Sequence, residues 1–398
     1  MNDKFLRSDI VIVGAGLVGL AAAVALQYAG FSVVLVDSKD STRSESYNEG
    51  WDARIYAISP RNMEWLNSLG VWPLMHANRI GKMQGMEIFG EITQSPLILD
   101  SSDVNTGSLG FIVESKALIR ALLKRVEQLG IKTRFGCSCE MVKSSQCQAI
   151  LNLSNQEQLE CQLLLAADGS QSWVRQQMNI PIQKKVYEQV AIVANLKIEK
   201  PHGNIARQWF SIEGEVENSI LAWLPLPDNM ISIVWSVSIK QADMLLKLDL
   251  DDFATQVELA GDSKLGKLEI TGTIATYSLN LQKTCQLVKG NIVLIGDAAH
   301  QVHPMAGQGV NLGFRDIIDL IDILKTKNQF QAINDKNLLK KYTRDRKVDI
   351  LKMVILTDGL NQLFKNRSKV IKNIRNWGFS KVKHQAVKKM LVANAIAL

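Results

Sequence analysis

Three glycines near the N-terminus have the spacing of a turn that binds a dinucleotide. Gly14, Gly16 and Gly19 form the pattern Gly-x-Gly-x-x-Gly, and Asp37 follows 21 residues after the middle glycine. In such a pattern the first glycine permits a tight turn, the second lets the backbone approach a pyrophosphate, and the third lets a helix pack closely on a strand. The acid accepts hydrogen bonds from ribose hydroxyls. These residues predict a site for a cofactor that contains ADP, without identifying it.

The segments around this turn have the order that the turn requires. Residues 10–13 are β-branched, residues 17–29 are an alanine-rich helix former, and residues 31–36 are again apolar and β-branched. This order predicts one βαβ unit with the glycines between the first strand and the helix. The sequence has no second complete glycine triplet, so a nicotinamide nucleotide would have no βαβ domain of its own.

Two further acids follow apolar runs. Residues 162–167 precede Asp168, and residues 291–295 precede Gly296 and Asp297. Both runs are predicted to be strands, and the carboxyl ends of strands are where open α/β sheets bind ligands. The Asp168 segment could equally form a plain turn.

A glycine-rich segment follows Asp297. Three glycines and Pro304 fall within residues 304–313, which predicts a loop that brings backbone N–H groups close to a flat ring. Apolar residues from 314 to 324 then have helical spacing. His300 and His303 suggest a metal site, but the proline and glycines oppose the helix that would align them, so we expect no metal.

Composition places the chain among ordinary globular proteins. It has 398 residues, of which 46% are hydrophobic and 21% charged, which predicts two or three domains and excludes collagen-like and disordered classes. No run of about 18 uncharged apolar residues occurs, so no membrane-spanning helix is expected. Five cysteines without a Cys-x-x-Cys pair favour a reducing compartment over a disulfide framework or a zinc ribbon.

The middle of the chain has the character of an antiparallel sheet. Short β-type runs dominate residues 186–284, and residues 231–236 alternate larger apolar with smaller side chains. Trp209, Trp223 and Trp235 could line an aromatic pocket, but aromatic side chains on a sheet more often form its core. The core interpretation is favoured.

The C-terminal segment is basic. Residues 359–398 contain nine Lys or Arg and no Asp or Glu, and they predict two amphipathic helices. Their apolar faces could close the main domain, which is favoured, or contact a membrane or a partner protein. Nucleic acid is not expected, because the segment lacks a recognised fold and aromatic platforms for bases.

Three motifs together resemble the class A flavin monooxygenases typified by para-hydroxybenzoate hydroxylase, and within them the ubiquinone-biosynthesis hydroxylase family. The motifs are the glycine triplet with Asp37, the Asp168-Gly169 segment ending Ser172-x-Val174-Arg175, and Gly296-Asp297 followed by His303-Pro304-x-x-Gly307-Gln308-Gly309-x-Asn311-x-Gly313-x-x-Asp316. The last motif has the family signature without departures. One departure lies elsewhere: Ser115-Lys116 replaces the more usual polar and Arg-containing sequence after Glu114.

The resemblance implies an FAD site. Gly14, Gly16 and Gly19 would hold the pyrophosphate and Asp37 the adenosine ribose. Arg54 would contact the phosphate and ribityl region, although a surface ion pair would explain it as well. Asp297 would bind a ribityl hydroxyl, and Asp168 belongs to a motif linked to both FAD and the nicotinamide nucleotide. The loop from Pro304 to Asn311 would lie against the isoalloxazine, with Pro304, Gly307 and Gln308 nearest the reaction and Gly307, Gly309, Val310 and Asn311 holding the cofactor.

The resemblance also implies an activity. NADPH or NADH would reduce the flavin, O₂ would give a C4a-hydroperoxide, and the aromatic ring of a polyprenyl phenol intermediate of ubiquinone biosynthesis would be hydroxylated. Two alternatives stay open: a hydroxylase of a soluble aromatic compound, and a flavin-binding subunit of a lipid-pathway complex without turnover.

The expected fold is α/β, with a Rossmann-like FAD-binding domain, an inserted antiparallel-sheet substrate domain and a C-terminal helical segment. The FAD-binding domain would comprise residues 1–75, 101–180 and 285–335, the substrate domain 76–100 and 181–284, and the basic helical segment 336–398. We expect a cytoplasmic protein, with contact to the inner membrane or to ubiquinone-pathway proteins through the basic segment as the alternative.

Overall fold

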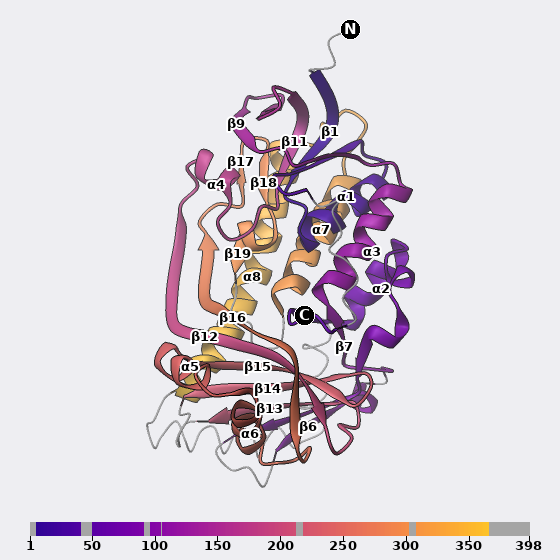
Figure 1. The fold of residues 1–398 in the computed structure, drawn as a ribbon. Helices are drawn as coiled ribbons and strands as arrows, with labels where there is room; N and C mark the ends of the chain where they lie inside the picture. Colours follow the sequence, from indigo (N-terminus) through magenta and orange to yellow (C-terminus); the bar gives the residue numbers. More distant parts are fainter. Residues whose placement is uncertain are drawn as a thin grey trace.

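The computed structural model describes residues 5–40, 50–90, 96–104, 106–211, 218–301 and 308–365. Within these residues the chain forms three sheets and eight α-helices (Figure 1). The first sheet lies at the end of the molecule that carries the N-terminus, and the second lies toward the opposite end. Two long strands, β12 (Ile182–Ile198) and β16 (Leu268–Thr284), connect the two ends.

The first sheet contains the predicted βαβ unit. Its order is β17-β18-β11-β1-β2-β8, with β10 and β9 added beside β11. The pairs between β18, β11, β1, β2 and β8 are parallel, and residues 10–13 and 33–36 are buried because both faces of the sheet are covered. The strands are β1 (Phe5–Val13), β2 (Val33–Asp37), β8 (Lys132–Phe135), β9 (Cys139–Ser144), β10 (Ala149–Leu153), β11 (Gln158–Ala166), β17 (Val288–Lys289) and β18 (Ile292–Leu294).

Helices cover the first sheet. The alanine-rich α1 (Leu17–Tyr28) is buried over most of its length, because it packs against α3 (Ser115–Gln128) and α7 (Gln308–Lys325) as well as the sheet. Short side chains let these helices approach closely. The predicted strand, helix and strand are therefore confirmed, with ends shifted by a few residues.

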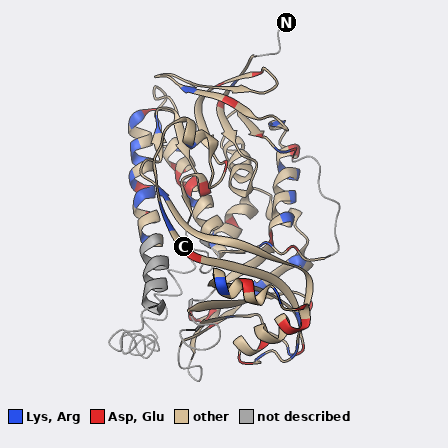
Figure 2. Cartoon of the chain, turned by 60° about the vertical axis from the view of Figure 1, so that its left-hand side comes forward, with Lys and Arg blue, Asp and Glu red and all other residues tan. Residues whose placement is uncertain are grey.

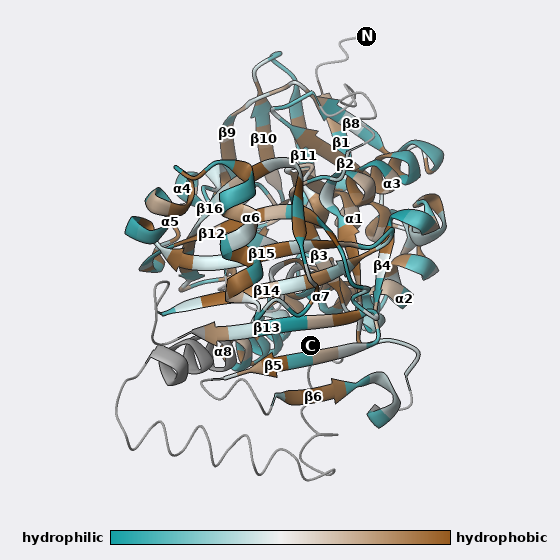
Figure 3. Ribbon diagram, turned by 60° about the horizontal axis from the view of Figure 1, so that its bottom comes forward, coloured by the Kyte–Doolittle hydropathy of each residue, from teal (hydrophilic) through white to brown (hydrophobic). Residues whose placement is uncertain are grey.

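The second sheet has two different faces. Its order is β19-β16-β12-β15-β14-β13-β5-β6, and β12 to β16 pair antiparallel as predicted. Helices α5 (Ile239–Leu245) and α6 (Leu250–Ala260) lie over one face of this sheet (Figure 3). Trp209, Trp223 and Trp235 are buried on that face together with residues of these helices, so the core interpretation of these tryptophans is confirmed. The remaining strands are β5 (Gly85–Phe89), β6 (Leu97–Asp100), β13 (Ile205–Ser211), β14 (Ser219–Leu226), β15 (Met230–Ser238) and β19 (His300–Gln301).

A small third sheet joins the two ends. It has the order β3-β7-β4, and strand β4 also contacts β14 of the second sheet. Its strands are β3 (Ile55–Ile58), β4 (Ile80–Met83) and β7 (Gly110–Glu114). The other short helices in the described residues are α2 (Pro60–Ser68), α4 (Trp173–Gln177), η1 (Trp72–Leu74), η2 (Ala77–Arg79), η3 (Ser101–Val104) and η4 (Gly296–Ala298).

Two C-terminal helices complete the described chain. Helix α8 (Lys336–Lys365) packs along α7, and Figure 2 shows Lys and Arg distributed along it with acidic residues between them. Of the two predicted basic helices, the first overlaps α8 only in residues 360–365, and the second lies entirely outside the described residues. No helix in the described ranges combines the length and the apolar character needed to cross a bilayer.

The start of α7 corrects one expectation. The glycine-rich loop was expected to extend to Asn311, but α7 begins at Gln308, so Gly309 and Gly313 are helical. Gly313 is tolerated there because a Cβ at this position would lie 2.6 Å from Val18 Cγ2, and only glycine allows α7 to approach that side chain.

Candidate functional site

The carboxyl ends of four parallel strands meet at one edge of the first sheet. β1 ends directly before Gly14, β2 ends at Asp37, and β11 ends two residues before Asp168. β18 ends two residues before Gly296. Parallel pairing brings these ends together, which is the usual ligand position in sheets of this kind.

The three glycines of the turn have different roles. Gly14 has a φ of +106°, and a Cβ there would overlap the carbonyl of Ala167. A Cβ on Gly19 would overlap the carbonyl of Gly14, so only glycine fits at this position in the first turn of α1. Gly16 differs, because a Cβ would meet nothing within 4 Å. The open space at Gly16 is where a pyrophosphate would approach the N-terminus of α1.

Asp37 fixes the turn from the neighbouring strand. Its Oδ2 accepts a hydrogen bond of 2.6 Å from the Ala15 N–H, and its Oδ1 accepts one of 2.8 Å from the Lys39 N–H. The carboxylate is half-buried beside the glycine turn. It can accept further bonds, so binding of ribose hydroxyls by Asp37 fits its position.

Asp168 and Arg175 connect two of the sequence motifs. Asp168 Oδ2 accepts a hydrogen bond of 3.0 Å from the Val174 N–H at the start of α4, and burial raises the pKa of this carboxyl. The Arg175 guanidinium donates to the Ser170 carbonyl at 2.8 Å and to the Ala298 carbonyl at 2.9 Å. The Asp168 segment thus braces the turn that carries Asp297. Contact of Asp168 with a cofactor stays a prediction.

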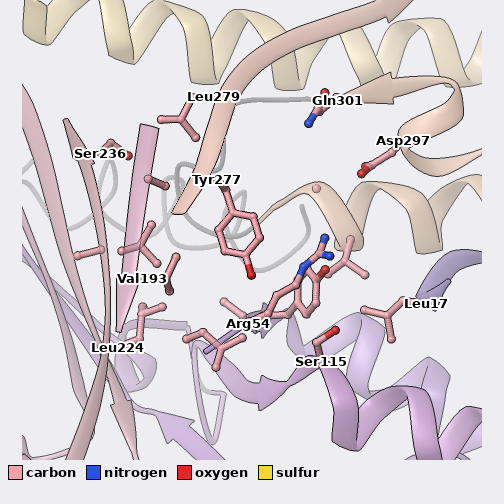
Figure 4. Close-up of a pocket in the computed structure, with 18 of the residues that line it drawn as sticks. Leu17, Arg54, Ser115, Val193, Leu224, Ser236, Tyr277, Leu279, Asp297 and Gln301 are labelled. Atoms are coloured by element: carbon pink, nitrogen blue, oxygen red, sulfur yellow. The ribbon is translucent and has the colours of Figure 1, made fainter. Parts of the chain in front are cut away.

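A cavity of about 520 Å³ opens beside the glycine turn, between the first and second sheets (Figure 4). One wall comes from the nucleotide-binding elements, and it includes Gly16, Leu17, Arg54, Asp297, Gly309 and Val310. The opposite wall is the free face of the second sheet, and it includes Ala191, Val193, Gln208, Ala222, Val234 and Ser236. The side chains that line the cavity on this face, from Ala222 and Ser236 to Ile220 and Leu224, are smaller than the tryptophans of the other face, and this leaves space for the cavity.

Charged and aromatic groups meet where the two walls join. The Arg54 guanidinium lies 5.4 Å from the ring centre of Tyr56 and 5.8 Å from that of Tyr277, and Figure 4 shows Arg54 and Tyr277 directed into the same space. Burial raises the pKa of Tyr56, although Arg54 opposes this. Burial also raises the pKa of Asp297, against the lowering effect of His300 and Arg54. Arg54 is therefore a cavity residue, and its surroundings are aromatic.

The loop residues are only partly described. Pro304 and Gly307 lie outside the described residues, as does the side chain of Gln308. Gly309 and Val310 line the cavity. The Asn311 side chain instead accepts from the Ser59 N–H and donates to the Ala57 carbonyl, at 3.0 and 2.7 Å. Any cofactor contact of Asn311 would therefore come from its backbone, and the predicted roles of these residues stay predictions.

A buried ionic cluster holds the turn that carries Asp297. Asp316 Oδ2 accepts hydrogen bonds of 2.8 Å from the Gly296 N–H and from His300 Nε2, while Arg346 Nε on α8 donates to Asp316 Oδ1 at 2.8 Å. Burial alone would raise the pKa of Asp316, but His300 and Arg346 hold it below its usual range. His300 is thus a structural partner of Asp316.

Sequence analysis missed the residues of the sheet wall. Tyr277, Gln208 and the small side chains opposite the glycine turn were not singled out. A sequence signal existed only for the β15 residues Val234 and Ser236, which are interleaved with the larger Ile233 and Trp235. Alternation assigns residues to faces but cannot tell which face borders a cavity.

The residues present fit FAD. The open cradle at Gly16, the acid at the end of β2 and the adjacent enclosed cavity provide places for a pyrophosphate, a ribose and a flat ring. When bound, FAD supplies the exchange of electrons with NAD(P)H and O₂. The fold and the site together define an FAD-binding protein with room for a second ring beside the cofactor.

Comparisons with known proteins agree. The family model described as FAD binding domain matches residues 7–355. Ubiquinone hydroxylase UbiL of Rhodospirillum rubrum is 31% identical over 96% of this chain and 88% of its own length. The 3-demethoxyubiquinol 3-hydroxylase of Escherichia coli is 29% identical over 96% of both chains. HpxO of Klebsiella pneumoniae, solved with FAD and uric acid, has the same fold, with a TM-score of 0.75 at 16% identity over 100% of this chain and 99% of its own.

The chain therefore belongs to the ubiquinone-biosynthesis hydroxylase family of FAD-dependent aromatic monooxygenases. The expected family, fold and cofactor are confirmed.

Proposed function

We propose that this protein hydroxylates the aromatic ring of a polyprenyl phenol on the route to ubiquinone, with FAD, NAD(P)H and O₂. The observation that carries the proposal is the cavity of about 520 Å³, which has the nucleotide-binding residues on one wall and small, mostly apolar side chains on the other. Ligand sites of about 300–1,000 Å³ hold drug-sized molecules, so a cavity that also receives the flat ring of FAD accommodates a substituted phenol ring but not a long polyprenyl chain. The rest of that chain would leave the cavity.

The residues have distinct tasks in this proposal. The glycine turn and Asp37 hold the ADP part of FAD, while Arg54 and Asp297 face the joint of the two walls. The sheet wall excludes water from the ring and orients it, which favours oxygen transfer to the substrate over release of hydrogen peroxide. No described side chain is assigned a proton transfer.

The test is hydroxylation by the FAD-loaded protein. We expect a geranylated phenol to stimulate NAD(P)H oxidation and to gain one oxygen atom by mass spectrometry. A soluble phenol that is hydroxylated equally well would favour the second interpretation, a hydroxylase of soluble aromatics. Bound FAD without substrate-dependent NAD(P)H oxidation would favour a flavin-binding subunit.

A peripheral membrane contact is part of the proposal. Residues 366–398 carry eight Lys or Arg and no acid, and basic segments are attracted to anionic headgroups. Truncation after Lys365 would leave α8 intact, and we expect it to weaken binding to phosphatidylglycerol vesicles at low salt. Unchanged binding, with the FAD spectrum retained, would remove the membrane contact from the proposal.

A further inference from the structure

Gln208 is a buried polar residue without a partner in the described part of the chain. Gln208 lies in strand β13 and borders the cavity. The residue is 6% exposed. No described residue forms a hydrogen bond with its amide. The atoms of this amide are not sealed in the core but reach the open space of the cavity, where a ligand can pair with them. The cavity is therefore where a partner for this amide belongs.

Gln208 is a polar residue in a row of apolar side chains that crosses the sheet. The strand register places Gln208 opposite Ala222, which lies opposite Val234 on the next strand, and Val234 lies opposite Val193. All four residues line the cavity, and Gln208 is the polar member of this row. A leucine would serve packing equally well at this position, so the amide is not explained by the core.

The chemistry of the amide defines what it can bind. A glutamine side chain donates two hydrogen bonds and accepts others, which suits a hydroxyl, methoxy or carbonyl oxygen on a ring. A polar group that stands in an apolar row of a cavity wall can fix the orientation of an aromatic ring, because it determines where a ring oxygen lies against that row.

We propose that Gln208 is a specificity-determining residue that hydrogen-bonds an oxygen substituent of the substrate ring and thereby selects which ring carbon faces the cofactor. This inference rests on the proposed function, because it requires an oxygenated aromatic substrate in this cavity. It goes further by naming the residue that discriminates that substrate from a hydrocarbon of the same shape.

The experiment compares Gln208→Leu with wild type, both loaded with FAD. Two ligands are used, geranylphenol and geranylbenzene, which differ in the ring hydroxyl. The dissociation constant of each is measured from the perturbation of the flavin absorbance, and the position of hydroxylation of geranylphenol is determined by NMR. We expect Gln208→Leu to raise the dissociation constant of geranylphenol about 10- to 100-fold, which corresponds to the loss of one buried hydrogen bond. Geranylbenzene should bind within about 2-fold of wild type, and any product should be a mixture of isomers.

Gln189→Leu is the matched control. Gln189 is equally buried, at 6% exposure, but its amide donates to the Asn218 carbonyl at 3.2 Å and does not line the cavity. We expect this variant to leave the ratio of the two dissociation constants unchanged.

The outcomes separate the two proposals. If Gln208→Leu keeps its FAD and binds geranylphenol as wild type does, or loses both ligands equally, the role of Gln208 is refuted while the proposed function stands. If wild type itself binds neither ligand, the proposed function fails and the role of Gln208 fails with it.

Discussion

Arg346 should be among the side chains on which stability depends most. Its guanidinium contacts Asp316 at 2.8 Å, Asp319 at 2.8 Å and Asp349 at 2.6 Å, and the side chains of Arg346 and Asp316 are both 1% exposed. Arg346→Met would leave the Asp316 carboxylate buried without its guanidinium partner. Removing one partner of a buried ion pair costs about 3–5 kcal/mol, and we expect the free energy of unfolding to fall by that amount.

The same helix offers a matched control. Arg344 and Asp345 also form an ion pair, at 2.9 Å, but their side chains are 72% and 40% exposed. Exposed pairs of this kind contribute about 0–1 kcal/mol, so Arg344→Met should change stability little. Urea unfolding followed by circular dichroism, at one fixed FAD concentration, compares the two variants with wild type.

The loss of stability in Arg346→Met should depend on pH. Burial opposes ionisation of Asp316, but His300 and Arg346 outweigh it and hold its pKa below the usual value of about 3.9. A carboxylate of this kind stabilises the fold above its unfolded pKa, and the contribution is lost as pH falls through the folded pKa. Arg346→Met weakens that effect, so the deficit should be largest near neutral pH and should shrink on acidification. A deficit below about 1 kcal/mol, or one equal to that of Arg344→Met, would refute this account of the cluster.

Three further predictions follow from the site. Gly16→Ala should fold normally, because a Cβ there meets nothing within 4 Å, but its affinity for FAD, measured by fluorescence titration, should fall. Gly19→Ala should fold poorly, because its Cβ would overlap the Gly14 carbonyl. Tight FAD binding by Gly16→Ala would contradict the proposed pyrophosphate position. Burial raises the pKa of the Cys161 thiol to about 12, so at pH 8 iodoacetamide should label the exposed Cys285 and spare Cys161, as judged by peptide mass spectrometry. Ala222→Phe should fill the cavity and abolish phenol-stimulated NAD(P)H oxidation with FAD retained, and unchanged stimulation would place the ring elsewhere.

The nucleotide-binding half was predictable from sequence because its signals are local. Glycines that permit one backbone path, a helix former and a β-branched strand occur within 37 residues, and their spacing defines the βαβ unit. The acids Asp168 and Asp297 are placed by the general rule for strand ends. By contrast, the start of α7 was misjudged because helix propensity disfavours glycine, whereas here close packing of Gly313 on Val18 overrides that preference.

The substrate wall could not be predicted in the same way. Its residues come from strands that are distant in sequence, and their shared face depends on the register between β12, β13, β14 and β15. The cluster around Asp316 depends likewise on α8, which is 30 residues downstream at Arg346. Neither the register nor the docking of that helix leaves a local pattern in the chain.

The long strands β12 and β16 affect how the two walls of the cavity can move relative to each other. Each has 17 residues, and they pair with each other along most of their length within the second sheet, so they form a two-stranded ribbon that extends from the cavity wall toward the end of the molecule that carries the first sheet. Because the two strands are paired, they would bend together, with the hydrogen bonds between them kept. Ladder irregularities occur between Val186 and Val190 and between Val193 and Asn195, and they are the places where the ladder can bend. Any change in the angle between the two walls is therefore expected at these two places, one of which adjoins the cavity residue Val193.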